Sequence, residues 1–483
     1  MKNIYIKIAG FIFFMSLIVS GCSDYLDINE DPDSPTYGQI TESVLLPGIL
    51  SSVSYELTGG YPARASSLWT QQIATTGTGR GISTLFLQDP DVNNTWKFTL
   101  YTGVLKNARL MQEKAIESES PQYEGIAYVV QAYGVSILAD FWGDAPWSEA
   151  LNDDIEKPVF DSQEELYTAI DDLLEKAIST LDAAINAGGT VNGDLLYNGD
   201  VEKWKKLAYS LRARYAMRLI YAKGDDQADM VLAYFEDGFA SNQDDAGFVF
   251  EDKENANNPW VQWQDKWTNL FVNKFVIDKL EADSDPRVDA FALKSEAEDI
   301  IVGGENGAVI QLDSVSLLST QNAQGALSGR GYYINNESAV DWMTYSELMF
   351  LASEAYLFKG DIVNAQDYLH KGIKANLQKI VSNGTLNIEE SDMDQFANGF
   401  ILPVDFESAQ KMIIEQKYIA NYLQIEPYND YRRTGYPEIP LPEVHFNDQI
   451  PVRFPYPTDP ILNNKANMPV VNYATDKVWW DQK

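Results

Sequence analysis

Apolar residues recur at every third or fourth position through most of this chain, which is the spacing of one buried face of an α-helix. In the segment 164–185 that face holds Leu166, Ile170 and Leu174, with charged residues between them. The same period predicts helices over the segments 41–57, 66–76, 95–116, 123–142, 164–185 and 201–222, the first bent at Pro47. The pattern therefore predicts a mainly α-helical protein.

A helix pair between residues 346 and 378 has the length of a structural repeat. Leu348, Ala352 and Tyr356 lie on one face of its first helix, Gly360 and Asp361 break the helix, and a second apolar face follows. Two helices in about 34 residues, with small residues where they cross, resemble a tetratricopeptide repeat. An ordinary helical hairpin has the same pattern, so both interpretations stay open.

Long stretches without a helical period separate these segments, at residues 77–95, 142–160, 236–259, 300–340 and 384–406. Loops longer than about 12–15 residues are usually either functional or disordered. Beyond residue 426 prolines become frequent, and a proline inside a helix removes a hydrogen bond and clashes with the preceding turn. We therefore expect a proline-rich C-terminal tail of extended segments and turns.

The N-terminus has the pattern of a lipoprotein signal. Lys2 and Lys7 accompany an apolar run that is shorter than the roughly 20 residues a membrane-spanning helix needs. Val19-Ser20-Gly21-Cys22 matches the lipobox of bacterial lipoproteins, and Cys22 is the only cysteine. We predict a signal peptide at 1–21, a lipidated N-terminus and spacer at 22–39, and one helical domain at 40–483. An ordinary signal peptide that contains a cysteine is the alternative.

The net charge of the chain limits the classes of partner that we expect it to bind. The chain carries 36 basic and 71 acidic residues, a net charge of −35. Binding to a phosphate backbone depends on lysine and arginine, so we expect no nucleic-acid partner. Anionic lipid repels such a body, which leaves the lipid on Cys22 as the expected membrane contact. Solubility alone also accounts for the acidity.

Motifs for catalysis or metal binding are missing from the sequence. Its two histidines, His370 and His445, are far apart, and it contains no HExxH, Walker A or GxSxG pattern. The stretch NEDPDS lacks the glycine and the last acidic ligand of a calcium loop. We predict a protein that is not an enzyme and holds no cofactor or metal. A glycosidase-like pair among the many carboxylates stays open.

Five segments in register resemble one known family. Besides the lipobox they are SILADFWGDAPWSEAL, YSELMFLASEAYLFKGD, IIEQKYIANYLQIEPYNDYRRTGYPEI and IPVRFPYPTDPILNNKANMP. Together they resemble the SusD/RagB family of outer-membrane nutrient-binding lipoproteins, in its SusD-like branch, over nearly the whole chain. The acidic Asp24 behind Cys22 is similar to the export signal of such lipoproteins.

That resemblance implies a fold, a role and a partner. The fold is an α-superhelix of four tetratricopeptide-like helix pairs, with long loops that build the ligand site. The role is capture of an oligosaccharide or, in RagB-like members, a peptide, at the cell surface. The partner is a SusC-like, TonB-dependent outer-membrane transporter that imports the ligand. No ligand-binding residue transfers from the family, because these differ between its members.

Aromatic residues in the loops are the best candidates for a ligand site, because the C–H faces of sugar rings pack on aromatic planes. The predicted ligand-binding residues are Arg80, Asp89, Asn94 and Trp96; Trp260 and Trp263; and Arg330, Tyr332 and Tyr333. If Asn258 caps a helix that begins at Pro259, Trp260, Trp263 and Trp267 share one face, and we expect Trp260 to be the most exposed. Core packing is the alternative for each group.

Two adjacent arginines, Arg432 and Arg433, are expected to be structural and to fix the tail to acidic helices. Three functions remain open from the sequence. The chain is a lipid-anchored nutrient-binding protein, a lipid-anchored glycoside hydrolase, or a repeat scaffold without a small ligand. The resemblance favours the first.

Overall fold

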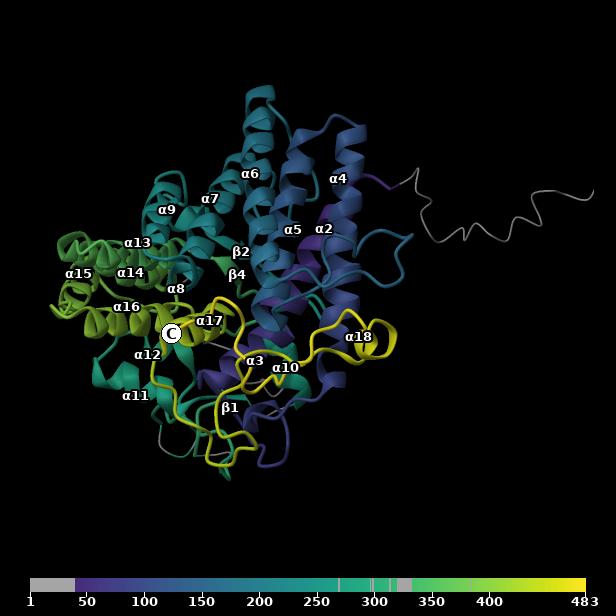
Figure 1. Ribbon diagram of the computed structural model, residues 1–483. Helices are drawn as coiled ribbons and strands as arrows, with labels where there is room; N and C mark the ends of the chain where they lie inside the picture. The colour runs from purple at the N-terminus through teal and green to yellow at the C-terminus, as the bar shows by residue number, and fades with distance from the viewer. Residues whose placement is uncertain are drawn as a thin grey trace, which may run out of the picture.

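The computed structural model describes residues 40–267, 270–295, 297, 299–311, 314–318, 332–382 and 384–483. The predicted signal peptide, Cys22, the spacer up to residue 39 and Arg330 lie outside these residues. The described chain is mainly helical, as predicted, and its helices stack as antiparallel neighbours (Figure 1).

The helices and strands have these bounds. The α-helices are α2 (Glu42–Ser51), α3 (Tyr61–Trp69), α4 (Asn107–Glu117), α5 (Pro121–Trp142), α6 (Gln163–Ala187), α7 (Val201–Arg218), α8 (Ile220–Lys223), α9 (Asp226–Phe235), α10 (Pro259–Trp267), α11 (Lys274–Ala282), α12 (Val288–Phe291), α13 (Tyr345–Phe358), α14 (Ile362–Ser382), α15 (Glu390–Asn398), α16 (Phe406–Ala420), α17 (Glu426–Thr434) and α18 (Thr458–Asn463). The π-helices are η2 (Ser52–Thr58) and η5 (Asn94–Lys106), and the 3-10 helices are η3 (Ile82–Thr84), η4 (Asp89–Val92) and η6 (Asn242–Asp244). The strands are β1 (Ile73–Thr75), β2 (Ala246–Phe248), β3 (Leu270–Val272) and β4 (Val340–Met343).

Consecutive helices pack closely because small residues stand where they cross. Helix α5 packs against α4 and α6, and α13 packs against α14 (Figure 1). A side chain at Gly125 would place its Cβ 2.6 Å from Leu181 Cγ, and one at Gly372 would lie 2.9 Å from the ring of Phe350. Contacts under 3 Å do not fit, so these crossings need glycine. The predicted helix pair at 346–378 is confirmed as α13 and α14.

The buried apolar residues form two clusters. The larger one runs through α2 to α13 and the C-terminal tail. The smaller one lies between α13, α14, α15 and α16 and includes Phe350, Leu369, Ile373 and Ile413. The second cluster underlies the larger of the two cavities described below.

Three expectations about local structure are wrong. The segment 66–76 is not one helix, because Gln71 adopts a positive φ of 55° and Ile73–Thr75 then forms β1. The stretch 384–406 contains α15. The tail contains α17 and α18, and α17 tolerates Pro427 because a proline in the first turn has no intrahelical partner to lose.

The C-terminal tail is fixed by buried polar contacts. Arg433 donates to both carboxylate oxygens of Glu354 at 2.7 Å and to Asp430 at 3.0 Å. Arg432 donates to the backbone oxygens of Asp140 and Val452, at 2.6 and 2.9 Å. The structural role predicted for both arginines is therefore confirmed. Further along, the buried Trp480 donates its indole N–H to Asp140 at 3.0 Å.

Among the described residues, none of the helices is both long and apolar enough to cross a bilayer.

Candidate functional site

A pocket of about 490 Å³ lies between α3, the chain around β1, and α10 with β3. We call it the Arg64–Trp263 pocket, and its lining residues are Tyr61, Arg64, Leu68, Thr75, Thr76, Gly77, Ile82, Trp263 and Leu270. Cavities of about 300–1,000 Å³ are the usual size for small-molecule sites. The pocket therefore has the room for a short oligosaccharide segment.

Helix periodicity and strand pairing bring these residues together. Tyr61, Arg64 and Leu68 follow one another by three and four positions, so they share one face of α3. The antiparallel pair β1–β3 places Thr75 opposite Leu270, which joins segments almost 200 positions apart. The buried Asn306 supports this wall, because it accepts the backbone N–H of Thr75 at 3.1 Å and donates to Ile73 O at 2.8 Å.

Trp263 and Arg64 form the polar and aromatic centre of the pocket. The Arg64 guanidinium carbon lies 4.6 Å from the centroid of the Trp263 ring, a cation–π contact. Both side chains are half-buried, so part of each stays open to solvent. Trp263 thus stays partly accessible to solvent.

Arg64 has an unusual electrostatic environment. Desolvation by burial lowers its pKa to about 10, against the opposing effects of Tyr55 and the exposed Glu56. Its Nε is buried without a hydrogen-bond partner, and no described carboxylate lies within ion-pair distance of its guanidinium. The side chain remains protonated at neutral pH and has donors to offer.

Tyr61 supplies a second donor beside it. Desolvation by burial, with a smaller effect of the Asp91 carboxylate, raises the pKa of Tyr61 far above its ordinary value. The phenol therefore stays protonated and can donate to a ligand oxygen. Thr75 and Thr76 add hydroxyl groups to the same wall.

Trp260 is not exposed, and the expectation that it is the most accessible tryptophan is wrong. It is 1% exposed and packs against Trp263 with ring centroids 5.7 Å apart. Asn258 caps α10 as predicted, by accepting the Trp260 N–H at 2.8 Å. On α10, Trp260 lies in the core and Trp263 lines the pocket.

The first predicted loop group does not gather at one place. Arg80 is exposed, and its guanidinium lies over the rings of Phe86 and Phe446, 5.2 and 5.4 Å from their centroids. It belongs to the stretch that supplies Gly77 and Ile82 to the Arg64–Trp263 pocket. Asp89 and Asn94 are exposed on η4 and η5, outside that lining.

Trp96 is a core residue. It is 5% exposed, and its ring lies 5.2 Å from those of Trp142 and Tyr101, centroid to centroid. The packing alternative considered for Trp96 therefore describes its environment. It also lines a small hollow of about 220 Å³ beside Pro460.

Tyr332 and Tyr333 lie in a separate aromatic group. Tyr333 packs against Phe291 and Tyr422, with centroids 5.2 and 5.0 Å apart, and against Tyr332 at 4.8 Å. Both are half-buried, and neither lines the Arg64–Trp263 pocket. Arg330, their predicted neighbour, lies outside the described residues.

Sequence reasoning missed Arg64 and Tyr61. A signal was present, because Arg64 is the one charged residue in the stretch YPARASSLW, which otherwise has the composition of a buried helix. A charge in such a stretch indicates either an ion pair or a site. Its proximity to Trp263 depends on the tertiary fold and has no sequence signal.

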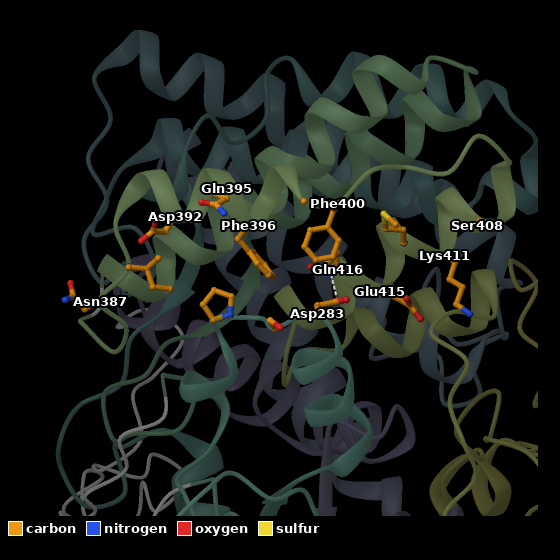
Figure 2. A pocket seen from close by; sticks show the side chains of 15 residues that line it. Asp283, Asn387, Asp392, Gln395, Phe396, Phe400, Ser408, Lys411, Glu415 and Gln416 are labelled. Carbon is orange, nitrogen blue, oxygen red and sulfur yellow. Dashed lines mark hydrogen bonds between the residues drawn. The ribbon is translucent and has the colours of Figure 1, made fainter.

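A second cavity of about 950 Å³ is a groove between α15, α16 and the turn after α11 (Figure 2). We call it the Phe396–Phe400 groove, because these two rings point into it from the α15 side. Its charged lining residues are Asp283, Asp392, Lys411 and Glu415.

Two of the charged residues that line this groove form ion pairs. Glu415 pairs with Lys279 at 2.6 Å, and Lys411 pairs with Glu438 at 2.7 Å. Desolvation, with Asp285 and Glu415 nearby, raises the pKa of Asp283, which accepts a long 3.4 Å hydrogen bond from Gln416 (Figure 2). Three of the four charged lining residues are therefore acidic, and Glu415 and Lys411 form ion pairs with residues outside the lining.

Within the described parts of the chain, no group of three or more His, Cys, Asp or Glu side chains is placed to hold a metal ion.

Comparison with known proteins decides the family. The profile of a SusD-like family, described as starch-binding and associating with the outer membrane, matches residues 34–457. The chain belongs to this SusD-like family. No curated protein matches the chain.

Solved structures of other SusD-like proteins share the fold. A chitin-binding protein superposes with a TM-score of 0.77 at 24% identity, over 91% of this chain and 100% of its own. A SusD homologue of Bacteroides fragilis gives 0.76 at 22% identity, over 92% and 100%. A chitin-binding SusD homologue of Flavobacterium johnsoniae gives 0.74 at 20%, over 91% and 98%. The predicted SusD-like superhelix is thus confirmed.

Proposed function

We propose that this SusD-like protein is a lipoprotein of the outer membrane that captures an oligosaccharide in the Arg64–Trp263 pocket. The observation that supports this most directly is a half-open tryptophan beside unpaired donors in a cavity of suitable size. The ring offers a surface for the C–H face of a sugar, and Arg64, Tyr61 and Thr75 offer hydrogen bonds to its hydroxyl groups.

Binding without hydrolysis follows from the composition of the lining. Glycoside hydrolysis needs two carboxyl groups on either side of the scissile bond. None of the described residues that line the Arg64–Trp263 pocket is Asp or Glu. We therefore propose a capture protein and treat the hydrolase as an outcome that the test can reveal.

The anchor and the partner belong to the same proposal. Cys22 carries the lipid that holds the protein on the outer membrane, facing the cell surface. A SusC-like, TonB-dependent transporter then receives the captured ligand. The lipobox in the sequence and membership of a family described as associating with the outer membrane support this.

Calorimetry with the purified protein tests the capture role. The panel contains neutral and acidic oligosaccharides, chitin and starch fragments among them, and mixed peptides, and each sample is analysed for cleavage afterwards. We expect an oligosaccharide to bind uncleaved, and Trp263→Ala to weaken its binding at least about fivefold, since stacking on an aromatic ring contributes about 1 kcal/mol or more. Phe98→Ala, on an exposed aromatic residue away from the pocket, is the matched control.

The possible results separate the alternatives. Binding of peptides alone supports a RagB-like capture protein, and cleavage supports the hydrolase. Equal effects of Trp263→Ala and Phe98→Ala place the glycan elsewhere. The anchor is tested by Cys22→Ser, which we expect to release the protein from the outer-membrane fraction.

A further inference from the structure

The guanidinium of Arg64 is the only charged group that the described residues contribute to the lining of the Arg64–Trp263 pocket. Other buried arginines each have at least one hydrogen-bond partner within the protein, although the Nε atoms of Arg432 and Arg453 are also unsatisfied. Arg214 and Arg433 pair with carboxylates, and Arg432 donates to backbone oxygens. The guanidinium of Arg64 lies against the ring of Trp263 and donates a hydrogen bond to no described atom.

This lack of a partner is notable in so acidic a protein. The chain has 71 acidic residues to 36 basic ones, so a carboxylate for a structural arginine is easily available. Partly burying an unpaired cation is unfavourable, and the lowered pKa of Arg64 reflects this cost. A ligand that brings its own negative charge recovers that cost on binding, whereas a neutral hydroxyl recovers only hydrogen bonds.

We infer that the ligand of this pocket is an acidic saccharide, whose uronate carboxylate pairs with Arg64 while a sugar ring packs on Trp263. Arginine suits this role because its planar fork binds a carboxylate through two parallel hydrogen bonds. The guanidinium carbon lies 4.6 Å from the centroid of the Trp263 ring, so the fork lies beside the ring on which the sugar packs. This inference rests on the proposed function, since it names the class of glycan that the capture site takes.

The net charge of the protein disfavours non-specific binding of anions. A body with a charge of −35 repels anions at long range, so a non-specific anion gains little from approaching it. An acidic glycan binds only where a specific cation outweighs this repulsion at short range. The Phe396–Phe400 groove offers no such cation, because its Lys411 is already paired with Glu438.

The test compares acidic oligosaccharides with their own neutral forms. Calorimetry with the full purified protein uses tetramers of galacturonate, glucuronate and mannuronate, each beside its carboxyl-reduced counterpart, which keeps the ring stereochemistry and removes the charge. We expect at least one acid to bind at least about tenfold tighter than its reduced form.

Two variants assign the effect. Arg64→Gln keeps an amide donor but loses the charge, and we expect it to abolish the preference for the acid. Arg64→Lys keeps the charge and should retain part of the preference, which separates loss of charge from misfolding. Trp263→Ala should weaken the binding of the acid and of its reduced form to a similar extent.

The outcomes keep the two proposals distinct. If every acid binds no tighter than its reduced form, or if Arg64→Gln preserves the preference, the acidic ligand class is wrong. Binding of a neutral glycan that depends on Trp263 then still supports capture. If none of the acidic or neutral saccharides binds, both proposals are wrong.

Discussion

Arg433 and Arg64 are two arginines of one protein with opposite environments. Arg433 lies on α17, which packs against α3, the helix that carries Arg64. Arg433 is 1% exposed and holds two carboxylates at 2.7–3.0 Å, whereas Arg64 is half-buried against a tryptophan with no carboxylate. Although the two helices pack together, the charge of Arg433 is used by the fold and that of Arg64 is available to a ligand.

The surroundings of Arg433 show what complete pairing looks like. A chain of buried ion pairs joins α5, α7, α13, α16 and α17, and its members are Asp140, Arg214, Arg218, Glu347, Glu354, Lys417, Glu426, Asp430 and Arg433. Burial alone raises the pKa of Glu426, but Arg218, Arg214 and Lys417 outweigh it and lower that pKa to about 2. Glu426 therefore stays charged wherever the protein is folded near neutrality.

The largest expected effect comes from breaking this network. Arg433→Met leaves Glu354 buried without its cation and Asp430 with Lys417 alone, and removing one partner of a buried pair costs about 3–5 kcal/mol of unfolding free energy. Chemical denaturation measures it. Lys359→Met is the matched control, since its pair with Asp229 is exposed and contributes about 1 kcal/mol or less. Equal losses in the two variants would contradict a special role for the buried network.

The buried Trp96 and the half-buried Trp263 of the pocket extend the comparison to aromatic residues. Trp96→Ala removes a core ring and should lower the unfolding free energy by about 3 kcal/mol. Glycan affinity should stay within about twofold of the wild type, because Trp96 lies outside the Arg64–Trp263 pocket. Denaturation and calorimetry on one sample check both. A loss of affinity in the folded variant would return Trp96 to the ligand site.

A third charged group lies between these extremes, because Asp245 and Asp341 share the single cation of Lys379. Desolvation raises the pKa of Asp245 to about 6, Lys379 opposes it, and Asp341 adds to it. The folded state thus binds a proton more tightly than the unfolded state, so this group lowers stability as the pH rises from about 4 to 6.

Asp245→Asn should remove that dependence. The unfolding free energy of the wild type relative to the variant should fall by about 2 kcal/mol between pH 4 and 6 and then level off. Denaturation at several pH values measures this difference. A difference that rises with pH in this interval would mean that Lys379 dominates and that the pKa of Asp245 is lowered.

The smallest effect is expected at the Phe396–Phe400 groove. Phe396→Ala and Phe400→Ala alter the larger cavity, yet glycan affinity should change by less than about twofold, because the groove lies on other helices than the Arg64–Trp263 pocket. Calorimetry with the glycan that the wild type binds decides it. A substantial loss would show that the ligand site extends into this groove.

The sequence predicted the helices where one period runs uninterrupted. Helices α5, α6 and α7 match the segments 123–142, 164–185 and 201–222 to within a few residues, because burial of one face determines them. The C-terminal helices were missed because frequent prolines hid that Pro427 occupies a permitted first-turn position. The local sequence pattern thus explains why α5, α6 and α7 were predicted and why the C-terminal helices were missed.

The candidate site was predicted only in part. Trp263 was found because three tryptophans stand at helical spacing, but the period does not say which of them faces outward, so Trp260 was ranked above it. Arg64 and Tyr61 were missed because the pocket forms only when β1 pairs with β3 and brings α3 to α10. Such a juxtaposition depends on long-range packing and leaves no mark on a short segment.

The position of Trp480 has a consequence for the order of folding. This fully buried residue completes the surroundings of Asp140, which lies more than 300 positions earlier and also holds Arg218. A growing or partly translocated chain therefore lacks a side chain of its own central core until residue 480 is available. Such a chain stays incompletely folded until then, and a truncation just before Trp480 should prolong its exposure to proteases.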